Sequence, residues 1–462
     1  MTMQLARKRH LRGRLAVFLA AIAAFGAPLL GASLESTESS AQTSRPNILV
    51  VLTDDQHMYH LKNMPFLSSK PRGKWVRFPR TFLNVPFCCP SRATILTGQY
   101  AHHHGINGSN GSKLDDSSTI ATWLDGAGYR TGLVGKYLNG YPFRTDVDNY
   151  IPPGWDYWAA FLDVDHYNYS LNENGKSVFY GSRPKDYSTD VLRRKAMRFL
   201  DTTPLNRPFF LLLSTHAPHE PSFPAPRHEG VYEDLPMFYG PNFNEADVSD
   251  KPAWVRNLPL RPKGGIDQRQ RDASEALLAV DESIKVIMNK LVERGQLKNT
   301  IVLFMTDNGF SFGAHRWVEK KCAYEECVRT PLLIRYPARP INRIDKRLVS
   351  NVDIAPTIAD LAQASPTIRV DGRSLVPLLN NRRGLGWRSS LLLAYQGPVT
   401  SGESPNFWAV RTRGWKYVEL ATGEKELYNL KSDPFELVNV INNPSSASVI
   451  PYLRQELDRL KR

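Results

Sequence analysis

Cysteine is scarce in this chain. The four cysteines among 462 residues are the adjacent pair Cys88 and Cys89 and the later pair Cys322 and Cys327. This number is too small for a disulfide scaffold, and the spacing matches no zinc finger. Hydrophobic residues make up 42% and charged residues 23% of the chain, which excludes disorder as the main state. The fold must therefore rest on a hydrophobic core, and the length is sufficient for two or three domains.

Acidic residues are fewer than basic ones. The chain has 45 Asp and Glu against 59 Lys and Arg, which gives a net charge of +14. This balance favours anionic partners, whether small sulfated or phosphorylated molecules, acidic polysaccharide or nucleic acid. The basic residues are scattered and form no basic arm, and we find no helix-turn-helix, RNA-binding or zinc-finger pattern. We therefore do not expect nucleic acid as a partner.

Only the N-terminus contains a long apolar run. Five basic residues between positions 7 and 14 precede the run Leu15 to Leu30, and small residues follow at 31–33 and 39–41. This is the layout of a secretory signal, so we predict that residues 1–42 are a signal peptide and linker. The protein would then be exported, to the medium, the periplasm, the cell surface or the lysosome. An uncleaved membrane anchor is the alternative, but the run is short and broken by Pro28, and we expect no stable membrane span after cleavage.

Continuous apolar runs alternate with helical patterns in the rest of the chain. Runs without alternation are typical of strands buried on both faces of a mostly parallel sheet. Apolar residues at helical spacing predict helices between the runs. The sequence therefore predicts an α/β sandwich with a large mixed, mostly parallel sheet between helices. The predicted strands are 48–52, 129–134, 209–213, 301–305 and 332–334, and the predicted helices are 274–294 and 117–126.

Two regions depart from this pattern. Residues 221–270 contain many Pro, Asn and aromatic residues without a clear period, so we predict a long surface excursion there. Beyond residue 385 the segments 408–412, 415–420 and 426–428 predict antiparallel hairpin strands, and Leu453, Leu457 and Leu460 predict a final helix. We therefore predict a main domain at 43–385 and a smaller C-terminal subdomain with an antiparallel sheet at 386–462.

Polar clusters follow three of the predicted strands. Asp54 and Asp55 follow the first, His216 and His219 follow the second, and Asp307 with Asn308 follows the third. Ligands of open α/β sheets bind beyond the carboxyl ends of the strands, so these clusters are expected to converge. Carboxylate and amide oxygens suit a hard divalent cation, calcium or magnesium, better than zinc. The alternative is that each Asp only caps a helix or turn.

The segment from Cys88 to Gly98, CCPSRATILTG, is the most specific feature of the sequence. A nucleophile at the start of a helix, with Arg92 one turn on, can address a tetrahedral oxyanion, because helix N-termini favour anions. The alternative is that Cys88 and Cys89 are small buried hydrophobes or take part in a disulfide elsewhere. The segment resembles the signature C-x-P-S-R of type I sulfatases, which implies that Cys88 is oxidised to formylglycine by a formylglycine-generating enzyme.

This resemblance extends from Pro46 to about Asn439. It implies an alkaline-phosphatase-like fold, with Lys136 in the active-site lysine turn, His216 and His219 in the histidine segment and Lys320 as the second lysine. The catalytic residues implied are Cys88, Arg92, Lys136, His219, Lys320 and His216, and the metal ligands are Asp54, Asp55, Asp307, Asn308 and the modified Cys88. Many sulfatases carry a histidine two residues after the first lysine, whereas this chain has Leu138 there. The run Gly135 to Asn139, GKYLN, is similar to that of N-acetylglucosamine-6-sulfatases and implies a sulfated sugar or glycan as the substrate.

The resemblance also implies a mechanism. One hydroxyl of the hydrated formylglycine attacks sulfur, the metal lowers the pKa of that hydroxyl and binds a sulfate oxygen, and the second hydroxyl later expels sulfate. A phosphonate monoester or phosphodiester hydrolase of the same superfamily is the first alternative. A relative that binds sulfated glycans without turnover is the second.

Several remaining residues have a structural or open interpretation. We expect Asp353 to cap a helix, and we do not expect a metal at His102, His103 and His104, because adjacent positions point in different directions. His315 is either a site residue, as the resemblance implies, or a solvated loop histidine. Cys322 and Cys327 could pair in an exported protein, although five positions apart within a helix is too far for a disulfide. The sequons at Asn107, Asn110 and Asn168 leave glycosylation open.

Overall fold

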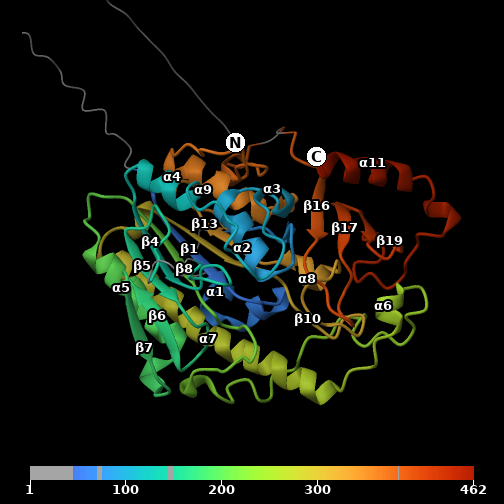
Figure 1. The fold of residues 1–462 in the computed structure, drawn as a ribbon, viewed down its shortest axis with the longest axis horizontal. Helices are drawn as coiled ribbons and strands as arrows, with labels where there is room; N and C mark the ends of the chain where they lie inside the picture. The colour runs from blue at the N-terminus through green and yellow to red at the C-terminus, as the bar shows by residue number, and fades with distance from the viewer. Residues whose placement is uncertain (1–44, 70–74, 144–148, 383, 385) are drawn as a thin grey trace, which may run out of the picture. The chain divides into compact units, whose positions relative to one another are not determined.

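A ten-stranded mixed sheet forms the centre of the described structure (Figure 1). The computed structural model describes residues 45–69, 75–143, 149–382, 384 and 386–462, so the predicted signal peptide lies outside the described residues. The strands stand in the order β14 (Arg343–Ile344), β2 (Trp75–Arg77), β13 (Leu332–Arg335), β9 (Thr300–Thr306), β1 (Asn47–Thr53), β8 (Phe209–Ser214), β4 (Arg130–Gly135), β5 (Tyr157–Phe161), β6 (Tyr169–Glu173) and β7 (Lys176–Tyr180).

The five central strands, β9, β1, β8, β4 and β5, run parallel, whereas β13 and β6 join them antiparallel. Successive residues of β1 pack on opposite faces of the sheet. Ile48 and Val50 belong to the core under one helical layer, and Leu49 and Val51 belong to the core under the other. Burial on both faces explains why the central strands are apolar without alternation, and the predicted sandwich is confirmed.

Helices cover both faces of this sheet (Figure 1). One layer contributes residues of α2 (Cys88–Thr97), α4 (Ile120–Gly126), α9 (Ile354–Ala362) and α10 (Val376–Leu379), and the other contributes residues of α1 (Pro65–Ser68), α5 (Ser188–Thr202) and α7 (Lys263–Glu293). The shorter helices are α3 (Ala101–His104), α6 (Ala253–Arg256) and α8 (Glu325–Val328). None of the helices in the described part of the chain combines the length and apolarity that crossing a bilayer requires.

The C-terminal part builds a separate four-stranded antiparallel sheet, as predicted. Its strands are β16 (Ser390–Tyr395), β17 (Phe407–Thr412), β18 (Trp415–Leu420) and β19 (Lys425–Asn429), and the chain ends in α11 (Ile450–Leu460). Leu453 and Leu457 of α11 pack on Val410 and Tyr417 of this sheet. The first strand, β16, was not among the predicted hairpin strands.

The predicted helix 274–294 begins earlier than expected. The helix α7 starts at Lys263, so the predicted excursion at 221–270 ends inside it, and α6 interrupts the excursion. The first turns of α7 escaped prediction because they are rich in polar residues and bury only Ile266 and Gln270 before Ala273. Most of 221–262 has no regular structure, as expected.

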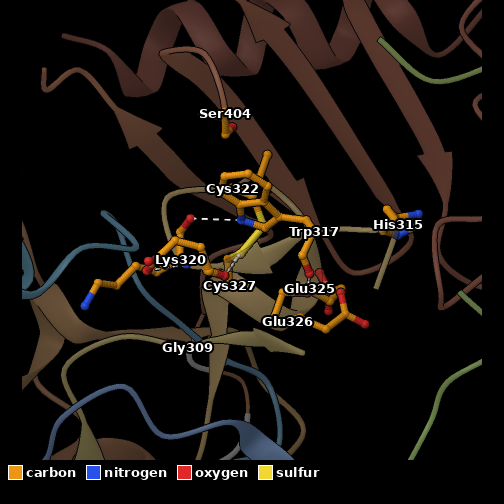
Figure 2. The surroundings of a disulfide bond; sticks show 12 residues. Gly309, His315, Trp317, Lys320, Cys322, Glu325, Glu326, Cys327 and Ser404 are labelled. Carbon is orange, nitrogen blue, oxygen red and sulfur yellow. Dashed lines mark hydrogen bonds between the residues drawn. A yellow bond between two sulfur atoms is a disulfide. The ribbon is translucent and has the colours of Figure 1, made fainter. Parts of the chain in front are cut away.

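Cys322 and Cys327 form a disulfide, with 5.6 Å between their Cα atoms (Figure 2). The distance objection fails because Cys322 lies in a turn before α8, so the two residues do not share a helix. Trp317 Nε1 donates to the carbonyl of Lys320 over 3.1 Å on one side of this loop, and Cys327 Sγ lies 3.6 Å from the carbonyl of Glu319. The disulfide and Trp317 therefore both brace the segment that carries Lys320.

Three minor strand pairs complete the described fold. Strand β3 (Thr81–Phe82) pairs with both β12 (Arg329–Thr330) and β15 (Val349–Ser350), and β10 (Ser311–Phe312) pairs with β11 (Val318–Glu319). Asp353 has the structural role that was predicted: its carboxylate accepts from the backbone N–H of Ser350 over 2.9 Å and pairs with Arg388 over 2.6 Å.

Candidate active site

The carboxyl ends of three parallel strands gather the predicted polar clusters at one edge of the sheet. Thr53 at the end of β1 pairs with Thr306 at the end of β9, and Leu52 pairs with Ser214 at the end of β8. The next residues along each strand are therefore neighbours in space. This register brings Asp54, Asp307 and His216 together, although they are far apart in the sequence.

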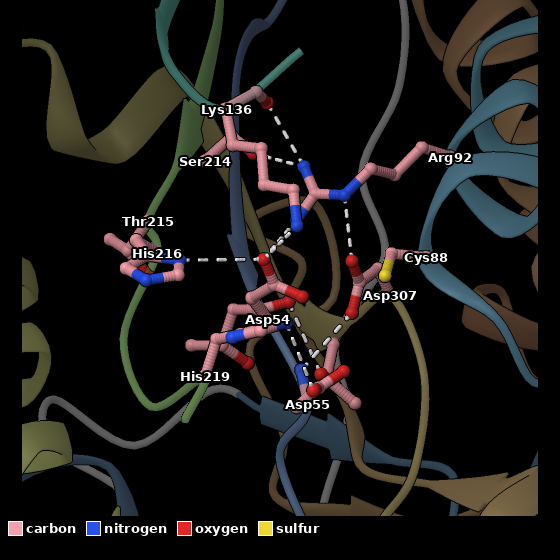
Figure 3. A network of polar contacts seen from close by, with 12 residues as sticks. Asp54, Asp55, Cys88, Arg92, Lys136, Ser214, Thr215, His216, His219 and Asp307 are labelled. Atoms are coloured by element: carbon pink, nitrogen blue, oxygen red, sulfur yellow. Dashed lines mark hydrogen bonds and ion pairs between the residues drawn. The ribbon is translucent and has the colours of Figure 1, made fainter. Parts of the chain in front are cut away.

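The three carboxylates form one buried group (Figure 3). The backbone N–H of Asp55 donates to Asp307 Oδ1 over 3.2 Å, and Asn308 Nδ2 donates to Asp55 Oδ1 over 2.5 Å. Lys320 Nζ donates to both oxygens of Asp55, over 2.8 and 2.6 Å. Asp55 holds this position with a φ of 59°, in the left-handed region that an aspartate tolerates better than most residues.

Basic side chains close the other side of the group. Arg92 Nε donates to Asp307 Oδ2 over 2.6 Å, and Lys136 Nζ donates to Asp54 Oδ2. The second arm of Arg92 is fixed by the carbonyl of Lys136 over 2.9 Å and by Ser214 Oγ over 2.7 Å. The group of polar contacts around Asp54, Asp55 and Asp307 is called the active-site cluster below.

Two buried oxygens of the active-site cluster have no protein partner. These are Asp54 Oδ1 and Asn308 Oδ1. Buried oxygens without a donor are rare and costly, so they indicate a ligand that accepts their lone pairs. Ligand atoms of Asp54, Asp55, Cys88 and His219 also lie within 4.8 Å of one another. The donors present therefore fit a hard divalent cation.

The electrostatics of the carboxylates differ. Burial alone would raise the pKa of Asp54, but the charge of Lys136 above all holds it well below its usual value. Burial opposes Lys320 in the same way at Asp55, whose pKa is also lowered. At Asp307 burial prevails over the guanidinium of Arg92 and raises the pKa to about 6. Asp54 and Asp55 therefore keep their charge to a lower pH than Asp307 does.

Cys88 is the first residue of α2 and is 2% exposed. Its Sγ lies 3.4 Å from Lys320 Nζ. Burial raises the pKa of the thiol, although Lys320 and Lys136 lower it in part. The N-terminal end of α2 thus presents the side chain at position 88 to the active-site cluster, and Cys89 points instead toward the carbonyl of Asn139 at 3.9 Å.

Two of the predicted histidines differ in exposure. The His219 side chain is 29% exposed, its Nδ1 donates to the carbonyl of Glu220 over 2.6 Å, and its Nε2 lies 3.4 Å from both Lys320 Nζ and Asp55 Oδ2. The His216 ring is buried behind it, 3.8 Å from Asp54, and burial lowers its pKa to about 3. His216 is therefore neutral near neutral pH.

Sequence reasoning missed His166. This residue precedes β6, and its ring lies 4.6 Å from that of His216 and stacks near Tyr187. Its Nε2 lies 3.3 Å from the carbonyl of His219, and burial lowers its pKa to about 4. It follows β5 together with Asp163 and Asp165, but the segment 157–161 was not predicted as a strand, so this polar strand end was not recognised.

The other histidines lie in different surroundings. His103 binds Asp371 over 2.7 Å, His104 contacts Thr94 over 3.1 Å and the His102 ring faces Trp408. The His102 and His103 rings nevertheless lie 4.2 Å apart, so the expected divergence holds only for His104. His315 is fully buried and binds Glu245 over 2.6 Å, so its interpretation as a solvated loop residue was wrong.

Comparison with known proteins decides the family. The sulfatase family model matches residues 46–364, and the model of the N-sulphoglucosamine sulphohydrolase C-terminal region matches residues 313–462. The chain belongs to the sulfatase family. It is accordingly a sulfuric ester hydrolase of the alkaline-phosphatase-like fold. The chain is 32% identical to human N-acetylglucosamine-6-sulfatase, across 89% of this sulfatase and 84% of the human protein.

Further similarities cover almost the same range. The chain is 28% identical to N-acetylglucosamine-6-O-sulfatase of Bacteroides thetaiotaomicron, across 94% of this sulfatase and 90% of that one. A protein solved in complex with its substrate D-glucosamine-2-N,6-O-disulfate superposes with a TM-score of 0.80, at 26% identity, over 90% of this chain and 97% of that chain. The phosphonate monoester hydrolase of Agrobacterium radiobacter has the same fold, with a TM-score of 0.72 at 21% identity over 90% and 95% of the two chains.

Proposed function

We propose that this sulfatase removes the 6-O-sulfate of a sulfated glucosamine residue, in a glycan or a fragment of one, with a formylglycine made from Cys88 and one bound calcium ion. The named activities of the human and Bacteroides relatives and the sulfated glucosamine bound by the solved neighbour support this substrate class. Magnesium is the alternative ion, because both cations prefer oxygen ligands.

One observation carries the proposal. Cys88, at the N-terminus of α2, lies within ligand distance of a buried carboxylate group that keeps two unpartnered oxygens. A structural cysteine has no need of such surroundings, because a small buried thiol behaves as a hydrophobe. The residues that would hold the ion are Asp54, Asp55, Asp307, Asn308 and the modified side chain at position 88.

The absent groups have a defined chemistry: the hydrated aldehyde supplies a hydroxyl nucleophile for sulfur, and the cation neutralises charge on the sulfate oxygens. The protein's own side chains then orient the ester. Arg92 holds Asp307 and Lys136 holds Asp54, so both carboxylates keep their positions when substrate enters. Lys320 Nζ, 3.4 Å from the sulfur of Cys88, is placed to stabilise an oxyanion there.

We assign protonation of the leaving alcohol oxygen to His219 in preference to His216. His219 is partly exposed, faces Lys320 with Nε2 and is oriented by the bond from Nδ1 to the Glu220 carbonyl. His216 is buried, and its lowered pKa leaves it without a proton to give near neutral pH. Its ring stacks on His219 at 5.0 Å, which suits a supporting role.

We also propose export of this sulfatase and a division near residue 385. The oxidised pair Cys322 and Cys327 is the kind of bond that persists outside the cytosol. Two relatives are named as extracellular sulfatases, one of them a Drosophila protein that is 33% identical over 79% of this chain and 34% of that protein. The C-terminal sheet with its own small core at Leu453 and Leu457 supports a subdomain at 386–462.

The test combines mass spectrometry with turnover. The chain is produced together with a formylglycine-generating enzyme, the Cys88 peptide is analysed for conversion to the aldehyde, and sulfate release from N-acetylglucosamine-6-sulfate is measured. Conversion and turnover are expected, and both are lost in Cys88→Ala. The matched control Cys89→Ala keeps both, because the Cys89 thiol points away from the cluster.

Two results would contradict the proposal. Faster release of phosphate from a phosphonate monoester or phosphodiester than of sulfate would favour the phosphoryl-transfer alternative. An unmodified Cys88 with no turnover of any ester, in material that still binds sulfated glycan, would favour a binding protein.

A further inference from the structure

A strip of positive charge begins at the β14 edge of the main sheet and consists of residues that do not belong to the active-site cluster. Its members come from segments far apart in the sequence, which the fold joins. Arg80, after β2, donates to the backbone carbonyl of Lys346, after β14, over 3.4 Å, and Arg347 donates to the carbonyl of Arg382 over 3.2 Å. We call this strip the basic edge and define it as Arg80, Arg329, Arg339, Lys346, Arg382 and Arg413.

Three charges of the basic edge, those of Arg80, Arg329 and Arg413, are close enough to act on one another. Besides its partial burial, Arg413, Arg411 and Arg329 lower the pKa of Arg80. Arg329 stands on β12 beside β3, which follows Arg80, and its Nε donates to the Pro79 carbonyl over 2.8 Å. The edge therefore continues from β14 and β2 across β12 to the turn between β17 and β18, which carries Arg413.

Acidic residues do not balance this charge. Within segments 75–82, 329–350, 376–382 and 411–416 the only acidic residue is Asp345. Asp345 is already paired with Arg347, over 2.9 Å, and Glu325 beside β12 is paired with Arg411. In the part of the chain that the structure describes, the six side chains of the basic edge make no ion pair. Arg339, Lys346, Arg382 and Arg413 are also exposed.

We propose that the basic edge is a second binding site, which holds a sulfated polysaccharide chain outside the active site. Guanidinium groups bind sulfate oxygens in a planar, bidentate way, and a strip of six spaced cations exceeds what one small anion needs. The choice of a sulfated polysaccharide over other polyanions rests on the proposed function, since the polymer that bears the substrate ester also bears the charge. A chain held here raises the local concentration of substrate at the active site.

The probe is fluorescein-labelled heparin, a highly sulfated polysaccharide that contains glucosamine, and its binding to the full chain is followed by fluorescence anisotropy. The test variant replaces the four exposed side chains of the edge, R339Q/K346Q/R382Q/R413Q. Arg80 and Arg329 stay because they bind backbone carbonyls. The matched control, K176Q/K185Q/R198Q/K285Q, removes the same charge from exposed positions on β7, on α5 with the turn before it, and on α7; β7 is the opposite edge of the sheet.

We expect the Kd for heparin to rise at least about tenfold in the test variant and less than about threefold in the control, with a shallower dependence on salt in the test variant. Turnover of N-acetylglucosamine-6-sulfate stays unchanged in both variants, whereas KM for a sulfated polymer rises only in the test variant. Circular dichroism and thermal unfolding check that both variants fold.

Three other outcomes of the heparin experiment would overturn or support the second site. Equal weakening in both variants would overturn the inference, because binding would then follow net charge alone. Competition by single-stranded DNA or phosphatidylserine vesicles as strong as that by unlabelled heparin, at equal charge concentration, would overturn the assignment to polysaccharide. Heparin binding that depends on the basic edge in a protein without sulfate ester turnover would support the second site and contradict only the proposed substrate.

Discussion

Two buried groups of charges can be compared within this sulfatase. In the active-site cluster, Asp54 Oδ1 and Asn308 Oδ1 have no protein partner. In a second group, between α8 and the C-terminal sheet, Lys416 Nζ lies 3.1 Å from Glu325 and 2.6 Å from Glu436, and Arg411 binds Glu325 over 2.9 Å. We call the second group the ion-pair cluster. Burial of charge is common to both, and Glu436 Oε1 also lacks a hydrogen-bond partner, so neither feature alone identifies a functional site. The clusters differ in that Glu436 Oε1 faces the ammonium of Lys416, whereas the active-site cluster leaves an amide oxygen, Asn308 Oδ1, unpartnered beside Asp54 Oδ1.

In both groups, burial raises the pKa of a carboxylate and nearby cations lower it, and the balance differs from one carboxylate to the next. Burial alone would raise the pKa of Glu325, but Arg411 and Lys416 outweigh it and lower that pKa, whereas at Glu436 burial prevails over Lys416 and raises the pKa to about 7. In the active-site cluster burial prevails at Asp307 and raises its pKa to about 6. The active-site cluster is the one whose converging ligand atoms include the Cys88 side chain, so a cation bound there would lie beside the proposed nucleophile. The comparison therefore predicts that mutations there impair function, whereas mutations in the ion-pair cluster impair stability.

The largest expected effect is on catalysis. Asn308→Ala removes an unpartnered amide oxygen from the active-site cluster, so we expect loss of the bound calcium and a fall in kcat/KM of about a thousandfold, which corresponds to about 4 kcal/mol. Metal content by elemental mass spectrometry and turnover of N-acetylglucosamine-6-sulfate measure both.

Asn172→Ala is the matched control for this variant. Asn172 is also buried, but it donates to Tyr141 Oη over 2.7 Å and to backbone carbonyls, so its loss should lower stability and leave the calcium in place. Stoichiometric calcium in Asn308→Ala would mean that the unpartnered oxygens do not mark the metal site.

The next effect concerns the ion-pair cluster. Lys416→Met leaves Glu436 buried without its cation and Glu325 with one cation fewer, so we expect the free energy of unfolding to fall by about 3 kcal/mol. The kcat of the folded fraction stays unchanged. Urea unfolding and active-site titration separate the two quantities.

The double variant Lys416→Met with Glu436→Gln sharpens this test, because it removes the uncompensated charge and should recover part of the lost stability. A fall in kcat for the folded Lys416→Met protein would show that the two clusters are not independent, contrary to the comparison.

Site residues could be predicted from the sequence where the pattern that indicates them lies within one short segment. Asp54, Asp55, Asp307 and Asn308 were found because each follows an apolar run that the two buried faces of a central strand require. Cys88 and Arg92 were found because one short segment carries them both. The convergence of the polar clusters that follow the strands could be predicted too, because parallel strands end at the same edge of a sheet.

The residues that were missed have their partners in other parts of the chain. His166 contacts the His219 carbonyl across 53 positions, and no local pattern records that contact. Charges that are scattered in the sequence form the basic edge only after β14 pairs with β2 and β12 pairs with β3. The disulfide was left open because the boundary of α8 decides whether Cys322 and Cys327 can meet, and helix ends are the least regular part of a pattern.

A third prediction concerns a buried group that carries no charge. His104 accepts from the backbone N–H of Ile106 with Nδ1 over 3.1 Å, and its Nε2 lies 3.1 Å from Thr94 on α2; burial lowers its pKa to about 4. As the pH falls, His104 is protonated near pH 6.5 in the unfolded chain and only at a lower pH in the folded protein. The contribution of neutral His104 to the free energy of unfolding is therefore complete above about pH 6.5. It is lost as the pH falls towards 4, by at most about 3 kcal/mol.

His104→Asn tests this effect, because the amide oxygen can still accept from Ile106 and does not titrate. Its free energy of unfolding, from urea titrations between pH 7 and 4.5, should fall less steeply than that of the wild type. Parallel pH profiles in the two proteins would show that the carboxylates of the two clusters, and not a buried neutral histidine, govern acid stability.

The smallest expected effect comes from the loop that joins the two clusters. Cys322 and Cys327 close a short loop between Lys320, which contacts Asp55 in the active-site cluster, and Glu325, which belongs to the ion-pair cluster. For a loop of this size, loss of the bond in Cys322→Ser with Cys327→Ser should lower the free energy of unfolding by about 2 kcal/mol. Trp317 still holds the Lys320 carbonyl, so kcat should change less than about threefold. A much larger loss of kcat, with stability reduced as expected, would mean that the disulfide positions Lys320, and the boundary between a catalytic and a structural cluster would then run through this loop.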